Sequence, residues 1–300
     1  MSVPTSYAPS QAGVAQVARD YVALTKPKVQ LLLLLTTVTT MYVAGDPSLS
    51  LIALTLIGGS LSAGGAAAVN HYWDRDIDAE MRRTATRPVP SGRISPRAAL
   101  TFGIMLAALS FAELAAAVNV LSAVLALSGF LGYVFVYTIW LKRRSPQNIV
   151  IGGAAGAMPP LVGWAAVTGG LDPAALYLFA IVFYWTPPHF WALSLLMKDE
   201  YARVGVPMMP VVHGERETRR QIVLYTVLLG TLTLLPVVFG FFGWIYGVVA
   251  LGLGAAFLVL AVRLQRRADR ASALRTYLFS LAYLAALFAA MVLDARVLGS

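Results

Sequence analysis

The chain contains no cysteine and little charge of either sign. Only 12% of its 300 residues are charged, whereas 58% are hydrophobic, and the mean hydropathy is +0.72. The lack of cysteine excludes disulfides, thiolate metal sites, iron–sulfur clusters and a cysteine nucleophile. A soluble domain carries roughly a quarter charged residues, so this chain lacks the polar side chains needed to cover a surface in water. The composition is that of an integral membrane protein.

Long stretches without charge predict the membrane-spanning helices, each of which needs about 20 apolar residues. The uncharged run from 221 to 262 would be about 63 Å long as one helix, at about 1.5 Å per residue. It must fold back, and the glycines and phenylalanines at 240–243 are the predicted turn. The run from 98 to 141, interrupted only by Glu113, must turn near Asn119. The sequence predicts an all-α protein with nine transmembrane helices, at about 29–45, 51–72, 98–116, 121–141, 148–167, 174–196, 221–240, 243–262 and 276–293.

The basic residues fall almost entirely on one side of this topology. All but one of the 23 Lys and Arg residues lie before the first predicted helix or in the loops after the even-numbered helices, and Arg296 is the exception. By the positive-inside rule the N-terminus and these loops are cytoplasmic. The net charge of +9 is therefore explained by topology. The expected environment is the lipid bilayer, and nucleic acid is excluded as a partner.

Residues 1–25 contain no apolar core of the kind that a signal peptide requires. We expect a mobile tail over 1–25 and a single polytopic domain over 26–296. A long Arg- and Ser-rich transit segment is also missing, which favours a bacterial cytoplasmic (inner) membrane over a mitochondrial one.

Oxygen-bearing side chains follow the second predicted helix at a regular spacing. Asn70, Asp74 and Asp78 are separated by four residues each, so they share one face of a helix within about 80°. Mg²⁺ prefers oxygen ligands and is commonly held by one or two carboxylates together with substrate phosphates. Arg82 and Arg87 follow at once and supply guanidinium groups that suit phosphate. The segment therefore predicts a metal–diphosphate site; the alternative is a charged helix end that only meets lipid headgroups.

A second acidic pair, Asp199 and Glu200, follows the sixth predicted helix. It is a candidate for a second Mg²⁺, although the neighbouring Lys198 and Arg203 also suffice to neutralise it. Basic residues at other helix ends can reach the same phosphates, and each is explained equally well as a topology-determining charge. These candidate substrate-binding residues are Lys26, Lys28, Lys142 and Arg143.

The chain resembles the intramembrane prenyltransferases of the UbiA superfamily, whose first motif is N-x-x-x-D-x-x-x-D. Within that superfamily it is similar to the branch that farnesylates heme. The blocks that carry the resemblance are LTKPKV, NHYWDRDIDAEMRRTATRPVPSGRIS, YTIWLKRRSPQNIVIGGAAGAMPPLVGW and FYWTPPHFWALSLLMKDEYARVGVPMMPVVHG.

The resemblance implies a nine-helix bundle around a central cavity, Mg²⁺ as cofactor, farnesyl diphosphate as donor and heme B as acceptor, with heme O and diphosphate as products. A downstream heme-modifying enzyme is a candidate partner. The resemblance assigns catalytic and metal-binding roles to Asn70, Asp74 and Asp78, and it extends them to Asp199 and Glu200. The second motif is often D-x-x-x-D, and here Arg203 occupies its last position, which places the second set in question.

Two histidines are candidates for contacting heme. His189 follows Pro187 and Pro188, which we expect to open the sixth helix, because proline removes a backbone donor and such irregularity is tolerated beside a cavity. The alternative is a histidine satisfied by a neighbouring backbone carbonyl. His213 lies in a loop with three arginines and is a candidate contact for heme propionates.

Two other functions remain open on the residues alone. A prenyltransferase of the same superfamily acting on a quinone or chlorophyll-type acceptor would share the first motif. A cation-coupled transporter would explain acidic residues at helix ends, but it should place them near the midplane of the membrane. In this chain the acidic residues cluster with basic residues at one face of the membrane. This arrangement favours an enzyme with a phosphate-bearing substrate over a transporter.

Overall fold

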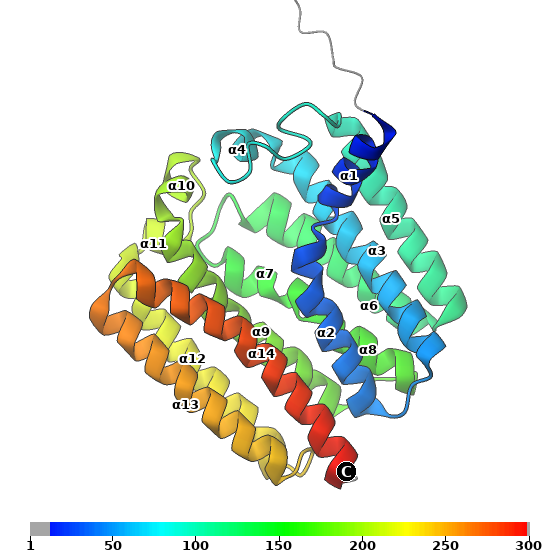
Figure 1. Ribbon diagram of the computed structural model, residues 1–300, viewed down its shortest axis with the longest axis vertical. Helices are drawn as coiled ribbons and strands as arrows, with labels where there is room; N and C mark the ends of the chain where they lie inside the picture. The colour runs from blue at the N-terminus through cyan, green and yellow to red at the C-terminus, as the bar shows by residue number, and fades with distance from the viewer. Residues whose placement is uncertain (1–12, 299–300) are drawn as a thin grey trace, which may run out of the picture.

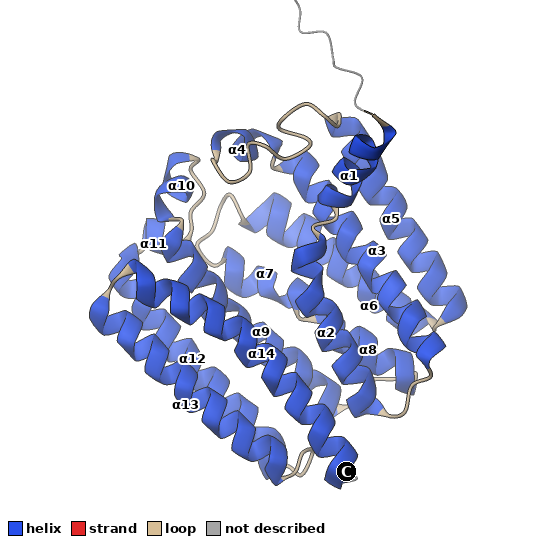
Figure 2. Ribbon diagram, in the orientation of Figure 1, coloured by secondary structure: helices blue, strands red, loops and turns tan. Residues whose placement is uncertain are grey.

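The computed structural model describes residues 13–298, which are helical with short connections and contain no strand (Figures 1 and 2). Within this range eight helical segments are long and apolar enough to cross a membrane. They are α2 (Pro27–Ala44), α3 (Leu49–Trp73), α5 (Pro96–Ala117), α6 (Val120–Leu131) continued by the π-helix η1 (Gly132–Leu141), α7 (Asn148–Gly156) continued by α8 (Met158–Thr168), α12 (Gly214–Val238), α13 (Trp244–Arg267) and α14 (Arg270–Leu298). The predicted all-α membrane protein is confirmed.

The helix α9 (Pro173–Leu196) lies among these segments and packs against α7, α12 and α14 (Figure 1). Its 24 residues are long enough to span a bilayer, but it is not one of the eight segments that are also apolar enough. The count of nine spans therefore stays a prediction.

The two predicted fold-back points are confirmed. Helix α5 ends at Ala117 and α6 begins at Val120, with Asn119 between them accepting a hydrogen bond from the backbone N–H of Ser122 at 2.8 Å. The side-chain amide of Asn119 also donates to the carbonyl of Ala165 in α8, at 2.8 Å. The second turn separates α12, which ends at Val238, from α13, which begins at Trp244.

The start of α13 is capped by a side chain from another helix. Asp294 in α14 is fully buried and accepts hydrogen bonds from the backbone N–H groups of Gly243, at 2.5 Å, and Tyr246, at 3.0 Å. These N–H groups belong to the first turn of a helix and have no partner within it. A carboxylate there also interacts favourably with the helix dipole.

The expected opening of α9 at its prolines is wrong. The helix runs without interruption through Pro187 and Pro188. Each proline removes one backbone hydrogen bond, but the flanking side chains fix this part of the helix through other contacts. The hydroxyl of Thr186 donates to the carbonyl of Val182 at 2.9 Å, and the indole N–H of Trp185 donates to the carbonyl of Ser280 in α14 at 2.7 Å.

Helices α3 and α5 approach each other closely because two glycines face one another. A Cβ built on Gly65 would lie 2.7 Å from the carbonyl oxygen of Gly103, and one built on Gly103 would lie 2.8 Å from that of Gly65. Both distances are too short for a side chain, so this contact fixes where the C-terminal half of α3 lies. That half ends at the residues of the site.

Four short helices lie at one end of the bundle, at the top of Figure 1: α1 (Val14–Leu24), α4 (Arg75–Glu80), α10 (Lys198–Arg203) and α11 (Met209–Val212). The expected mobile tail over 1–25 needs correction from Val14 onward, and its first twelve residues lie outside the described range. Leu24 is fully buried, and Asp20, 4% exposed, is bound by the Nε of Arg93 at 3.0 Å. An ion pair and an apolar contact therefore hold α1 against the bundle.

Replacing Arg93 with Ala should loosen α1. The substitution leaves the buried carboxylate of Asp20 without its cation, and a buried polar group that loses its partner costs about 1–3 kcal/mol. Amide hydrogen exchange over 14–24 should accelerate about tenfold or more, while exchange in α13 stays unchanged. Arg97→Ala, in the same region of the chain, is the control. Equal exchange in both variants would show that the ion pair does not hold the helix.

Candidate functional site

The predicted oxygen face lies at the junction of α3 and α4. Helix α3 ends at Trp73 and α4 begins at Arg75, so the single helix predicted from the spacing is interrupted at Asp74. The hydrogen bonds along the face are nevertheless kept: the N–H of Asp74 donates to the carbonyl of Asn70 at 2.9 Å, and that of Asp78 donates to Asp74 at 2.8 Å. Asn70, Asp74 and Asp78 therefore remain on one side, all three buried.

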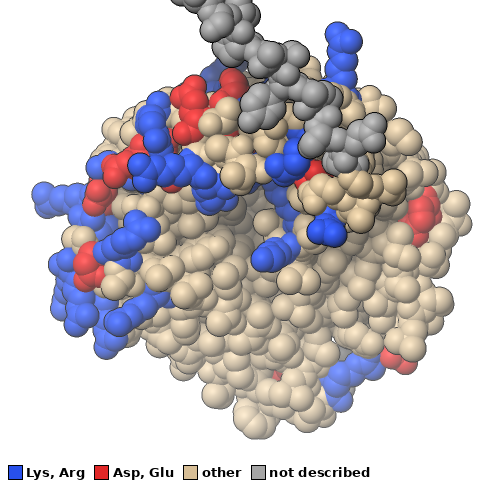
Figure 3. Space-filling model, turned by 45° about the horizontal axis from the view of Figure 1, so that its top comes forward, with Lys and Arg blue, Asp and Glu red and all other residues tan. Residues whose placement is uncertain are grey.

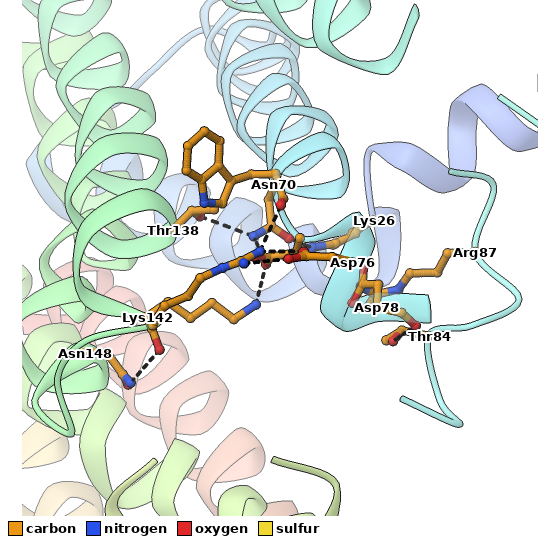
Figure 4. A network of polar contacts seen from close by, with 12 residues as sticks. Lys26, Asn70, Asp76, Asp78, Thr84, Arg87, Thr138, Lys142 and Asn148 are labelled. Carbon is orange, nitrogen blue, oxygen red and sulfur yellow. Dashed lines mark hydrogen bonds and ion pairs between the residues drawn. The ribbon is translucent and has the colours of Figure 1, made fainter. Parts of the chain in front are cut away.

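Each of these three side chains is bound by a cation from a different part of the chain (Figure 4). Lys26 donates to the amide oxygen of Asn70 at 2.8 Å, and Arg87 donates to Asp78 at 2.7 Å. Lys142, which directly follows η1, forms an ion pair with Asp74. The structure thus brings together six predicted site residues, and it pairs the metal-ligand candidates with the phosphate-binding candidates.

Arg143 connects the buried face to the surface. Its guanidinium donates to both carboxylate oxygens of Asp76, at 2.6 and 2.7 Å, and to the carbonyl of Trp73 at 2.9 Å. These hydrogen bonds lower the pKa of Asp76 to about 2. The same guanidinium lies 3.5 Å from Asp74.

Lys26 occupies a strained and cation-rich position. Its backbone is in the left-handed region, with φ 52°, at the start of α2. Burial, followed by the charges of Arg87 and Lys142, lowers the pKa of its ammonium to about 7, against the opposing effect of Asp78 and Asp74. Three cations thus converge on the oxygen face, and an anion bound among them would relieve their mutual repulsion.

The end of the molecule that carries this network is hollowed and rimmed by basic side chains (Figure 3). The opposite end carries Arg296, which pairs with Asp46 at 3.0 Å.

Sequence reasoning missed the hydroxyl and amide groups that support the network. Thr138 in η1 accepts a hydrogen bond from the side-chain amide of Asn70 at 3.2 Å. Thr84 donates to the carbonyl of Asp78 at 2.9 Å, and Asn148 donates to the carbonyl of Lys142 at 3.5 Å. The sequence offers only one indication that Thr138 belongs to the site: it lies four residues before Lys142. That spacing is common in any α-helix, so it does not distinguish Thr138 from other helix residues. Nothing in the sequence marks η1 as a π-helix.

The second acidic segment lies beside the first. Ile77 and Met81 from the α4 segment share an apolar cluster with Tyr201 of α10 and with Val206. Asp199 is exposed, and Glu200 has a buried carboxylate oxygen that accepts no hydrogen bond from described residues. Among residues 13–298 no three His, Asp or Glu side chains lie close enough to hold a metal by themselves. The metal role of Asp199 and Glu200 stays a prediction.

Three other predicted binding residues lie outside the network. Lys28, Arg82 and His213 are exposed. Their substrate-binding roles also stay predictions.

His189 is buried between α9 and α14. Its Nδ1 lies 2.7 Å from the hydroxyl of Ser280, and its ring stacks on Trp185 with centroids 4.3 Å apart. The Ser280 hydroxyl donates its proton to the carbonyl of Tyr277 at 2.6 Å, so it accepts a hydrogen bond from Nδ1–H. This assigns the tautomer of His189 and leaves the lone pair on Nε2. The alternative, a histidine satisfied by a backbone carbonyl, is not what the structure shows, because the partner of Nδ1 is a side-chain hydroxyl.

The donor set of the network fits Mg²⁺. It offers two carboxylates and one amide oxygen, the hard ligands that this ion prefers. The Oδ1 atom of Asp74 is buried and accepts no hydrogen bond within the described range, although the guanidinium of Arg143 lies 3.5 Å from it. A buried carboxylate oxygen without a donor is costly, and coordination to a cation would satisfy it.

The sequence profile described as the UbiA prenyltransferase family matches residues 33–287. This chain belongs to that family. A protein from Symbiobacterium thermophilum named protoheme IX farnesyltransferase is 54% identical over 283 residues, which cover 93% of this UbiA-family chain and 95% of the relative. A protein of the same name from Roseiflexus sp. is 56% identical over 94% of this chain and 53% of its own length. The chain thus spans about half the length of some of its curated relatives.

Solved structures share the fold of this family member. A digeranylgeranylglyceryl phosphate synthase matches with a TM-score of 0.77 at 18% identity, over 93% of this chain and 98% of the other. A UbiA homolog from Archaeoglobus fulgidus bound to GPP and Mg²⁺ matches with a TM-score of 0.70 at 18% identity, over 91% and 99% of the two chains. At this identity the comparison supports the architecture alone.

Proposed function

We propose that this chain transfers the farnesyl group of farnesyl diphosphate to a vinyl group of heme B, with addition of water, to give heme O and diphosphate. The observation that carries the proposal is the 54% identity to a relative named protoheme IX farnesyltransferase. The matched region covers 95% of that relative's length. The buried pairing of carboxylates with three cations supports the diphosphate part of the reaction.

Asn70, Asp74 and Asp78 would hold Mg²⁺, with Asp199 and Glu200 as candidates for a second ion. The bound ion neutralises charge that develops on the departing diphosphate. Asp74 is the central ligand in this proposal, because its buried Oδ1 accepts no hydrogen bond among the described residues and lies 3.5 Å from the Arg143 guanidinium, too far for one.

The three cations exchange partners when the substrate binds. In the structure Lys26, Arg87 and Lys142 each bind one oxygen ligand of the proposed ion site. Asn70, Asp74 and Asp78 would give up these cations when they hold Mg²⁺, and Lys26, Arg87 and Lys142 would then bind the diphosphate oxygens. The bond between C1 of the farnesyl chain and the diphosphate oxygen breaks more readily as these contacts strengthen in the transition state.

The chain excludes water while the allylic cation exists. The vinyl carbon of heme B attacks C1 and forms the new C–C bond, and water then adds to the resulting cation and loses a proton. Apolar helices on either side of the site keep water from C1 before that attack. Aromatic side chains near the site can stabilise the cation, each by a modest amount.

His189 is the proposed heme contact, and its Nε2 lone pair would be available to bind the iron. The tautomer fixed by Ser280 suits a metal ligand, whereas a propionate contact would need a proton on Nε2. The proposed setting is a bacterial cytoplasmic membrane with the network on the cytoplasmic side, and the downstream partner is an enzyme that modifies the product heme.

Replacing His189 with Ala should lower heme O formation at least about tenfold and change the KM for farnesyl diphosphate less than about threefold. Loss of an iron ligand affects the acceptor and leaves the donor site intact. Ser280→Ala, which removes the acceptor of Nδ1–H, should give a smaller loss in the same direction. The measurement is initial rate at varied heme B and farnesyl diphosphate. Equal loss of affinity for both substrates would assign His189 to folding instead.

The proposed function is tested by mass analysis of hemes extracted from membranes that contain the protein, supplied with heme B and farnesyl diphosphate. A heme heavier by one farnesyl group and one water, formed with Mg²⁺ and absent with a chelator, is the expected result. Release of diphosphate with other aromatic acceptors, and no modified heme, would assign the chain to a different acceptor within the family.

A further inference from the structure

The segment η1 brings side chains onto one face that an α-helix would separate. The four side chains are Tyr133, Tyr137, Thr138 and Lys142. The π-helical bonding extends to the end of the segment, where the N–H of Lys142 donates to the carbonyl of Tyr137, five residues earlier, at 2.8 Å.

The change of helix type alters the angular spread of these side chains. An α-helix advances about 100° per residue, and a helix with i→i+5 hydrogen bonds advances about 80°. The four positions would spread over about 180° in an α-helix and occupy about 80° in the π-helix. The π-helix therefore points the two tyrosines to the same side as Thr138 and Lys142.

Contacts on that face agree with this geometry. Thr138 binds Asn70, and Lys142 binds Asp74. The rings of Tyr133 and Tyr137 lie 5.3 Å apart, and the Tyr137 ring packs into the apolar cluster that joins α4 to α10. The aromatic pair thus continues the diphosphate-binding face toward the interior of the bundle.

Helix α7 lies against this face through a glycine. A Cβ built on Gly152 would lie 2.5 Å from Cδ2 and 3.0 Å from Cγ of the Tyr137 ring. One turn later, a Cβ on Gly156 would have no atom within 4 Å. Only the first glycine is needed for the ring to occupy its place.

We infer that Gly152 is a positioning residue of the prenyl diphosphate site, acting through the Tyr137 ring to keep η1 in the register that presents Thr138 and Lys142 to the diphosphate. The inference rests on the proposed function for the identity of the ligand. A methyl group at residue 152 displaces the ring and, with it, the face of η1 that carries both polar groups. Diphosphate binding and turnover then fall together.

The test uses full-length protein in nanodiscs and compares Gly152→Ala with the matched control Gly156→Ala. The probe is inorganic pyrophosphate with Mg²⁺, measured by calorimetry, and farnesyl transfer is measured in parallel. We expect the Kd for pyrophosphate to rise about tenfold and kcat to fall about tenfold in Gly152→Ala, with both values unchanged in Gly156→Ala.

A double substitution separates positioning from general misfolding. In a Tyr137→Ala background the ring that the new methyl group would strike is gone, so adding Gly152→Ala should change pyrophosphate affinity less than about twofold. A tenfold further loss in that background, or wild-type affinity in Gly152→Ala itself, would overturn the inference. If the wild-type protein binds no pyrophosphate, both the proposed function and this inference are overturned. If the wild-type protein binds it and Gly152→Ala binds it equally well, only this inference is overturned.

Discussion

Replacing Asp74 with Asn should lower kcat for farnesyl transfer at least about 1,000-fold. The side chain keeps its size but loses the negative charge that Mg²⁺ requires. It also loses the ion pair with Lys142, so the proposed transfer of Lys142 from this carboxylate to the diphosphate can no longer take place. Removing one well-placed electrostatic group at a reacting centre commonly costs about 100- to 1,000-fold, and this residue contributes twice. The measurement is heme O formation per mole of protein in isolated membranes.

Two further variants make the result specific. Asp78→Asn should fail in the same way, because Asp78 also offers a carboxylate to the ion and holds Arg87. Glu80→Gln, an exposed position on the same short helix, should retain turnover within about twofold. Normal turnover in Asp74→Asn and Asp78→Asn, with equal amounts of protein in the membrane, would remove both from the metal site.

Mg²⁺ should increase the affinity for pyrophosphate about 100-fold, within the range of coupling between two ligands of one protein. The reason is the pairing of each oxygen ligand with a cation: neither the ion nor the anion alone can engage its ligands without breaking an ion pair, whereas both together release all partners. Linkage requires that pyrophosphate raise the affinity for Mg²⁺ by the same factor. Calorimetry with each ligand in the absence and presence of the other measures both.

Lys142→Met should separate the two affinities. Without its cation Asp74 binds Mg²⁺ alone about tenfold more tightly, while the affinity for pyrophosphate in saturating Mg²⁺ falls about tenfold. Arg144→Met, an exposed position two residues later, is the control. A decrease of both affinities in Lys142→Met would contradict the partner exchange and indicate simple loss of structure.

Sequence reasoning succeeded where a single physical requirement decides the outcome. Membrane-spanning segments need length and apolar composition, so the ends of the predicted spans lie within a few residues of the observed helices for α2, α3, α5 and α9. The turn at 240–243 followed from the same length requirement. The alignment of Asn70, Asp74 and Asp78 followed from helix periodicity, and it holds because the i→i+4 hydrogen bonds continue across the break at Asp74.

Features that depend on tertiary contacts were not predictable. Residues 14–24 contain polar and apolar residues without a strong membrane signal, and their helix is held by Arg93, some seventy residues away. The prolines of α9 suggested a break, which the contacts of Trp185 and Thr186 prevent. The π-helix packs through Tyr137 against Gly152 in the next helix, a contact that no local pattern around Tyr137 reveals.

The cap that Asp294 places on α13 has a consequence for biosynthesis. The N–H groups of Gly243 and Tyr246 find their acceptor only about fifty residues later in the chain, so α13 leaves the ribosome before its cap exists. Until α14 is inserted, the turn at 240–243 can still adjust its depth in the bilayer. Insertion of the last helix then supplies the carboxylate that caps α13 and ties the α12–α13 hairpin to α14.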